Sequence, residues 1–190
     1  MSTPLHATPA STTRRLERIA VTGRFQPIHF DHLALLQHAF AQARHVVIGI
    51  TNPQPAVRTA HPASPHRHLA EANPWTYDER AELIDAALRC DGVNADRYSI
   101  LPFPLDEPAQ WPALLPPGTP QLVRVFSDWE REKVRRFAAA GYPPQVLEGD
   151  PATRLSASDI RSAMQNAEPW QHWVPPGARE RLLQWQRSRT

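Results

Sequence analysis

The sequence IAVTGRFQPIHFDH, residues 19–32, decides the fold of this chain. Its first four residues form a short apolar run, which predicts a buried strand that ends at Gly23. Glycine frees the backbone at the strand end, and Pro27 prevents helix formation until the turn is complete. Apolar residues then recur with helical spacing from Leu33 to Phe40. The stretch therefore predicts a strand, a tight turn and a helix.

The rest of the chain repeats this alternation. Apolar runs predict strands at 46–50, 98–101, 122–126 and 145–147, and amphipathic patterns predict helices at 76–88, 130–140, 160–166 and 178–186. Short strands alternating with helices indicate the α/β class, here a Rossmann-like open parallel sheet with a C-terminal helical segment. Such sheets bind ligands at the carboxyl ends of the strands, where the strand order reverses. We therefore expect the site at residues 23–32.

Composition sets the limits of the functional classes. A chain of 190 residues with 41% hydrophobic residues suffices for one domain, which we place at 19–190 after a Ser/Thr/Pro/Arg-rich, disordered tail at 1–18. The single cysteine, Cys90, excludes a disulfide framework and a cysteine-built zinc site. A balance of 21 basic and 19 acidic residues argues against nucleic acid as the main partner. The lack of a long apolar run argues against a membrane span, and the lack of a signal peptide predicts the cytoplasm.

His29 and His32 lie three residues apart on one face at the predicted helix start. A helix N-terminus carries positive potential and free N–H groups, so it attracts phosphate. Arg24 and the two imidazoles would add donors around the same anion. An isolated pair of this kind more often caps a helix, a zinc site would need further ligands, and Asp31 fits an ordinary first-turn acid. The context of the whole stretch favours phosphate binding.

A second candidate phosphate site is LSASDIR, residues 155–161. Ser156 and Ser158 lie at a predicted helix start, where hydroxyls and free N–H groups can hold phosphate oxygens. Arg161 follows about one turn later and can add a bidentate contact. Alone, this segment reads more readily as a capping box with a surface arginine. Together with the first motif, it favours phosphate binding by arginines and histidines, because the chain holds a single lysine, Lys133.

These motifs carry a family resemblance. GRFQPIHFDH resembles the GRFQPxHxGH signature of archaeal-type nicotinamide mononucleotide (NMN) adenylyltransferases, which belong to the HxGH nucleotidyltransferase superfamily. NPWT at 73–76, followed by Glu79 and Arg80, is similar to that family's NPF-T-x-x-ER segment, and LSASDIR matches its ISxTxIR-type motif. Trp111 falls near the tryptophan that stacks on nicotinamide in that family. The resemblance runs from about residue 19 to the last helix.

The resemblance implies nucleotidyl transfer, in which an acceptor phosphate oxygen attacks the α-phosphorus of a nucleoside triphosphate in line and pyrophosphate leaves. It implies catalytic roles for Arg24, His29, His32 and Arg161. It implies nucleotide binding by Gly23, Phe25, Gln26, Asp31, Ser156, Ser158 and Arg161, and acceptor binding by Asn73, Trp75, Trp111 and Asp128. Mg²⁺ is expected to enter with the triphosphate, because no carboxylate cage is evident for a resident metal. The sequence leaves the oligomeric state open, although relatives of this type form homo-oligomers.

Several positions depart from the family pattern. Asp31 replaces the glycine of HxGH, an Asp-Trp pair at 128–129 replaces the small and amide residues of an SGN-type loop, and Pro108 stands where the family has asparagine. The segment 52–74 is longer than its counterpart and carries Arg58, His61, His66, Arg67 and His68. We interpret it as a solvated loop, with a lid over an anionic acceptor as the alternative.

Three functions remain open. The leading hypothesis is adenylyl transfer from ATP to NMN, which gives NAD⁺. The second is the same chemistry with another nucleotide, such as CTP, and a phosphate or phosphonate acceptor. The third is a nucleotide-binding regulatory protein that has lost catalysis through Asp31.

Overall fold

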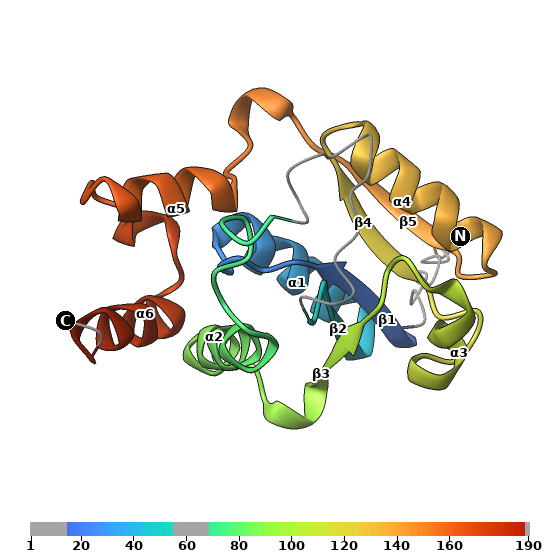
Figure 1. Ribbon diagram of the computed structural model, residues 1–190. Coiled ribbons are helices and arrows are strands. Elements are labelled where there is room, and N and C mark those ends of the chain that lie inside the picture. Colours follow the sequence, from blue (N-terminus) through green and yellow to red (C-terminus); the bar gives the residue numbers. More distant parts are fainter. Residues whose placement is uncertain (1–14, 55–68, 189–190) are drawn as a thin grey trace, which may run out of the picture.

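The computed structural model describes residues 15–54 and 69–188, and these form an α/β domain around a five-stranded sheet (Figure 1). All paired strands run parallel, in the order β3-β2-β1-β4-β5. The strands are β1 (Leu16–Gly23), β2 (Ala43–Thr51), β3 (Tyr98–Phe103), β4 (Gln121–Val125) and β5 (Pro144–Glu148). The predicted fold class is confirmed.

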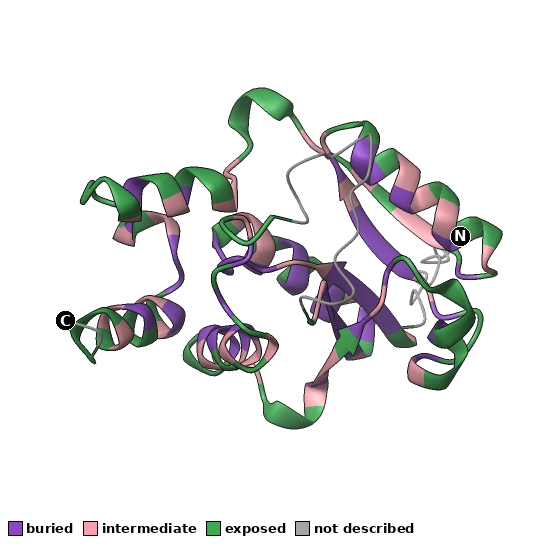
Figure 2. Cartoon of the chain, viewed as in Figure 1, coloured by how far each residue is buried: buried purple, intermediate pink, exposed green. Residues whose placement is uncertain are grey.

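Helices cover both faces of the sheet. They are α1 (Phe30–Gln42), α2 (Tyr77–Cys90), α3 (Trp111–Leu114), α4 (Asp128–Ala139), α5 (Ala157–Gln165) and α6 (Pro176–Ser188). Alternate residues of β1 face opposite sides, so Ile19 and Val21 belong to the core cluster that includes residues of α1, α2, α5 and α6, whereas Ala20 belongs to the cluster that includes residues of α3 and α4. The central strands β1, β2 and β4 are the most buried, the edge strands β3 and β5 are partly buried, and the outer helix faces are exposed (Figure 2). The domain is therefore a three-layer sandwich.

Local capping explains where two helices begin. The hydroxyl of Thr76 accepts from the N–H of Glu79 at 3.2 Å, and the Glu79 carboxylate accepts from the N–H of Thr76 at 2.8 Å. This is the capping box that the sequence predicts at the start of α2. Ser156 likewise accepts from the N–H of Asp159 at 3.2 Å and fixes the start of α5.

Strand order reverses at β1, which pairs with β2 on one side and with β4 on the other. After β1 the chain enters α1 on one face of the sheet, and after β4 it enters α4 on the other face. This is the switch point at which the sequence analysis places the ligand.

Some boundaries differ from the sequence prediction. Strand β1 begins at Leu16, inside the predicted tail, and α4 begins at Asp128, two residues earlier than predicted. The tail residues 1–14 and the basic positions of the long loop (Arg58, His61, His66, Arg67 and His68) lie outside the described residues. Within the described ranges, every helix is too short or too polar to span a bilayer.

Candidate active site

A cleft of about 460 Å³ opens at the carboxyl ends of β1 and β4. Its floor is the turn after β1 and the first turn of α1, and α4 and α5 lie on either side of α1 (Figure 1). We call Ser156, Ser158 and Arg161 the α5 wall, and Trp129, Glu130 and Lys133 the α4 wall; all six line the cleft. The two predicted phosphate motifs are therefore brought together at one site.

The turn after β1 is held by an amide clamp. The Gln26 side chain donates to the carbonyl of Trp75 at 2.9 Å and accepts from the N–H of Trp75 at 3.1 Å. Phe25 has a φ of 52°, and a Cβ at Gly23 would lie 3.1 Å from the Phe25 ring, so glycine lets this ring pack closely against the strand end. The Gln26 side chain is buried and held in this clamp, so it shapes the turn, and the residue also lines the cleft where a nucleotide contact is expected of it.

Arg80, on α2, fastens the turn to the neighbouring strand ends. Its guanidinium is fully buried and donates to the carbonyls of Arg24, Thr51, Asn52 and Thr76 at 2.8–3.0 Å. A buried cation requires such compensation, and five N–H donors suit several carbonyls at once. The ER pair of the sequence motif therefore supplies one residue to a capping box and one to the floor of the site.

His29 and His32 stack on each other at the cleft floor, with their ring centroids 3.8 Å apart. Burial, together with the charge of Arg154, lowers the pKa of His29 to about 3. Burial and the neighbouring His29 hold the pKa of His32 well below its usual range. Both imidazoles are thus neutral at pH 7, and within the described part of the chain the Nδ1 atom of each is buried without a hydrogen-bond partner. A neutral imidazole can still donate one N–H to a phosphate oxygen.

Arg161 joins the two motifs. Its guanidinium donates to the carbonyl of Gln26 at 2.7 Å and to the hydroxyl of Ser158 at 3.0 Å. Burial lowers the pKa of this guanidinium, which remains a cation. The arginine predicted from the second motif therefore ties α5 to the turn after β1.

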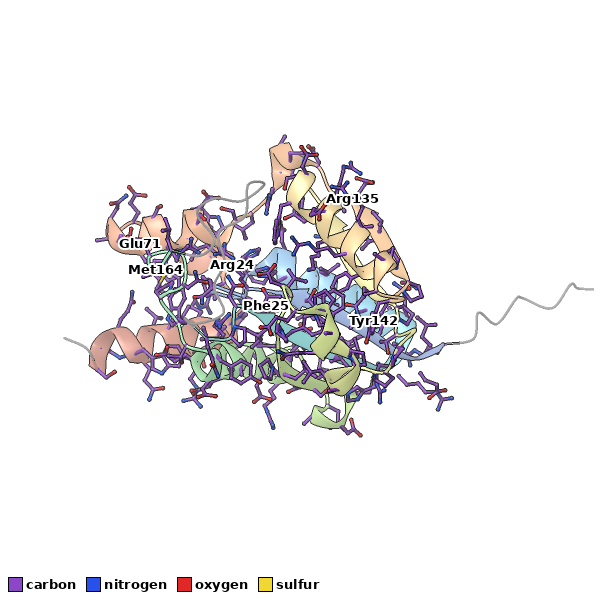
Figure 3. The ribbon with its side chains drawn as sticks, turned by 45° about the vertical axis from the view of Figure 1, so that its right-hand side comes forward. Arg24, Phe25, Glu71, Arg135, Tyr142 and Met164 are labelled. Atoms are coloured by element: carbon purple, nitrogen blue, oxygen red, sulfur yellow. The ribbon has the colours of Figure 1, made fainter. Side chains whose placement is uncertain are left out.

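Asp31 makes a second tie between the motifs. Its carboxylate accepts from the backbone N–H of Leu155 at 3.0 Å, across 124 residues of sequence. The residue that departs from the HxGH pattern thus fixes the entry of the chain into α5. Arg24 also lines the cleft, and its guanidinium donates to the carbonyl of Ala72 at 3.2 Å; Figure 3 shows it near the centre of the molecule.

The α4 wall was missed by the sequence analysis. Glu130 accepts from the hydroxyl of Ser127 at 2.6 Å and from Arg154 at 3.3 Å, and Lys133 donates to the carbonyl of Thr22. Positions 129, 130 and 133 share one helical face, and Lys133 is the single lysine of the chain. That spacing and that composition were the available signals.

Trp111 is not available to stack on an acceptor. It is fully buried, its indole N–H donates to the carbonyl of Pro104 at 2.8 Å, and its ring packs against Phe103, Phe137 and Tyr142. The acceptor contact expected of Trp111 stays a prediction, and in the structure its side chain belongs to the core beneath α4.

The other three predicted acceptor residues also lie away from the described cleft lining. Asn73 is buried and donates to the carbonyl of Leu69 at 2.8 Å. Trp75 is buried in the core on the α1 and α2 side, and Asp128 is exposed at the first residue of α4. Their predicted positions follow the family motifs, but the side chains serve packing or face solvent.

The donor set offers little to a resident metal ion. Among the described residues, no group of three or more His, Cys, Asp or Glu side chains is placed to hold one. The cleft carboxylates of Asp31 and Glu130 are engaged by Leu155, Ser127 and Arg154. A protein-held Mg²⁺ does not fit this set, because the ion prefers several oxygen ligands in octahedral array.

A parallel sheet with histidines, arginines and a helix N-terminus at its switch point is an arrangement typical of α/β proteins that bind nucleotide phosphates. Residues 20–163 match the family described as Cytidylyltransferase-like. The chain belongs to this family and is a nucleotidyltransferase.

Named relatives divide between two reactions. The chain is 37% identical to phosphonoformate cytidylyltransferase of Streptomyces viridochromogenes, over 84% of this chain and 89% of that protein. It is 30% identical to nicotinamide-nucleotide adenylyltransferase of Thermococcus kodakarensis, over 87% of this chain and 81% of that protein. The resemblance to archaeal-type NMN adenylyltransferases is thus confirmed.

In fold, the chain resembles a crystal structure of a bifunctional NMN adenylyltransferase/ADP ribose pyrophosphatase from Francisella tularensis. The TM-score is 0.68 at 17% identity, over 90% of this chain and 50% of that one. The chain spans about half the length of that protein. This likeness supports the nucleotidyltransferase fold.

Proposed function

We propose that this protein transfers a cytidylyl group from CTP to a small acceptor that carries a phosphonate or phosphate group. The burial of Trp111 carries the proposal, because the aromatic platform expected for a nicotinamide ring is packed into the core. The 37% identity to a phosphonoformate cytidylyltransferase supports the same assignment. It replaces adenylyl transfer to NMN as the favoured reaction.

The triphosphate would lie along the α5 wall. Ser158 and Arg161, with the N-terminal N–H groups of α5, face the cleft and supply the donors that phosphates need. Ser156 shares its hydroxyl with Asp159, so its contribution would come through the helix start that it fixes. Mg²⁺ would enter as part of the substrate, coordinated by phosphate oxygens and water.

The reacting α-phosphate would lie over the two stacked imidazoles. An acceptor phosphonate oxygen, already anionic at pH 7, forms a bond to the α-phosphorus while the bond to the bridging oxygen breaks and its electron pair leaves with pyrophosphate. No general base is required. His29 and His32 would donate N–H groups to the phosphate oxygens, and Arg24 would orient the charge, so catalysis rests on positioning and electrostatics.

Adenylyl transfer to NMN is the second candidate. Archaeal relatives of that name are about 30% identical over most of the chain, and the GRFQP turn that resembles their signature is held in place here by the Gln26 clamp. A nicotinamide ring would then have to use a surface other than Trp111.

The deciding experiment measures pyrophosphate release with Mg²⁺ and each of ATP, CTP, GTP and UTP, in the presence of phosphonoformate, NMN or no acceptor. We expect release with CTP and phosphonoformate, and a cytidylylated phosphonate by mass spectrometry. NAD⁺ formed from ATP and NMN, with no cytidylyl product, would overturn the proposal in favour of the second candidate. Loss of the product in a His32→Ala variant would show that it forms at this cleft.

A further inference from the structure

Lys133 is the single lysine among 21 basic residues, and it is 8% exposed on the α4 wall. Its ammonium reaches the end of β1, where it donates to the carbonyl of Thr22. Arg131 and Arg135, on the same helix, instead pair with glutamates at the surface. Burying an ammonium costs several kcal/mol of desolvation, so the position of Lys133 inside the cleft indicates a role other than solubility.

The charge of Lys133 acts on the catalytic floor. It lies close enough to His32 to contribute, after burial and His29, to the lowered pKa of that imidazole. On the same wall, the Glu130 carboxylate is matched by Arg154 at 3.3 Å. The α4 wall therefore brings the positive charge of Lys133 close to the histidine pair.

The geometry of in-line displacement determines which substrate lies beside Lys133. The attacking oxygen and the leaving oxygen must lie on opposite sides of the α-phosphorus. If pyrophosphate leaves along the α5 wall, the attacking group must approach from the α4 side of the two imidazoles. Lys133 lies on that side, at the carboxyl end of β1.

We propose that Lys133 binds the phosphonate or phosphate group of the acceptor and holds its attacking oxygen in line with the leaving pyrophosphate. This inference rests on the proposed transfer reaction. A lysine ammonium is a compact point charge with three donors on a flexible stem. It suits a small oxyanion that must arrive and leave as part of a larger product, whereas a bidentate arginine would fix one orientation of the group.

The test is Lys133→Met, which keeps most of the side-chain length and removes the charge. With CTP and phosphonoformate, we expect the acceptor KM to rise about 10- to 100-fold, the loss typical of a hydrogen bond to a charged group, while the CTP KM changes less than about threefold. Lys133→Arg keeps the charge and should recover part of the acceptor affinity. Arg135→Met, on the exposed side of the same helix (Figure 3), should leave both constants unchanged.

A role limited to bracing β1 predicts a different result. Lys133→Met would then lower the midpoint of thermal unfolding and leave the acceptor KM unchanged in the folded fraction, and this would overturn the inference. Equal rises in the CTP and acceptor KM would also overturn it, since they would place Lys133 on the triphosphate.

The proposed reaction and this inference fail separately. Wild-type turnover of NMN and ATP, but not of phosphonoformate and CTP, would refute only the reaction. Lys133→Met would then be judged by the NMN KM, with a selective rise in support and no change against. Wild-type activity with neither acceptor would refute both.

Discussion

The two walls of the cleft differ in how the chain builds them. The α5 wall comes from six consecutive residues, 156–161, whose spacing follows directly from a capped helix start. The α4 wall comes from a helix whose sequence carries no phosphate motif, and its side chains are aimed inward by packing against β4 and β5. The local sequence determines a wall made of backbone N–H groups and their caps, whereas a wall made of long side chains depends on the tertiary structure.

The largest expected effect is on stability, and it tests whether Trp111 has a structural role outside the two walls. Trp111→Ala should lower the free energy of unfolding by about 3–5 kcal/mol, because it leaves a cavity among Phe103, Phe137 and Tyr142. Denaturant unfolding measures this. The milder Trp111→Phe should keep the acceptor KM at its wild-type value. A raised acceptor KM with unchanged stability would return Trp111 to the site and remove the contrast between the walls.

His32 lies between the walls, so its loss should affect turnover rather than either substrate. His32→Ala removes a donor aimed at developing charge and should lower kcat about 10²- to 10³-fold, with both KM values within about threefold of wild type. Steady-state kinetics with each substrate varied in turn provides the test. Comparable losses in kcat and in nucleotide affinity would assign His32 to the α5 wall instead.

Because the histidine pair is neutral in the fold, acidification should lower the stability of the folded protein. The pKa of His29 is about 3 in the fold, against an ordinary histidine value of 6.5, so the unfolded chain binds more protons between these two pH values. Stability should therefore fall as the pH drops below 6.5, by about 2 kcal/mol at pH 5 from His29 alone.

Urea unfolding of wild type and His29→Gln at pH 7 and pH 5 isolates this contribution. The variant should lose about 2 kcal/mol less than wild type over that interval. Identical losses would mean that His29 takes up a proton as readily in the folded protein as in the unfolded chain, so that burial does not hold it neutral.

The smallest expected effect concerns the tie between the first turn and the α5 wall. Asp31→Gly removes the acceptor of the Leu155 N–H and should cost about 1 kcal/mol, seen as a roughly fivefold higher nucleotide KM with kcat kept. Asp31→Asn retains an acceptor oxygen and should behave like wild type. If the glycine variant instead shifts preference from CTP toward ATP, the carboxylate reads the base directly.

The sequence was informative wherever function is encoded in local geometry. The caps at the starts of α2 and α5 and the parallel α/β sheet were predicted, since each depends on short-range spacing or on the strand–helix alternation, and the two motifs predicted to bind phosphate line one cleft. The acceptor residues Asn73, Trp75, Trp111 and Asp128 were transferred from a family pattern that specifies position but not exposure. Whether a tryptophan lines a cleft or fills a core depends on what packs around it, and for Trp111 those neighbours come from distant segments of the chain.

The hydrogen-bond partner of Asp31 could not be predicted either. The residue was recognised as a departure from glycine, but its bond to Leu155 joins positions 124 residues apart. Only the folded chain shows that this carboxylate fixes a loop.

Arg80 has a consequence for how such a site can diversify. Its guanidinium donates to four carbonyls, which come from the ends of β1 and β2 and from the start of α2. The floor of the cleft is therefore held rigidly. Substitutions on the inward face of α4 alone could then accommodate a new acceptor, because they would leave the positions of the bound phosphates unchanged. Grafting that single helical face between relatives offers a compact route to exchanging acceptor specificity.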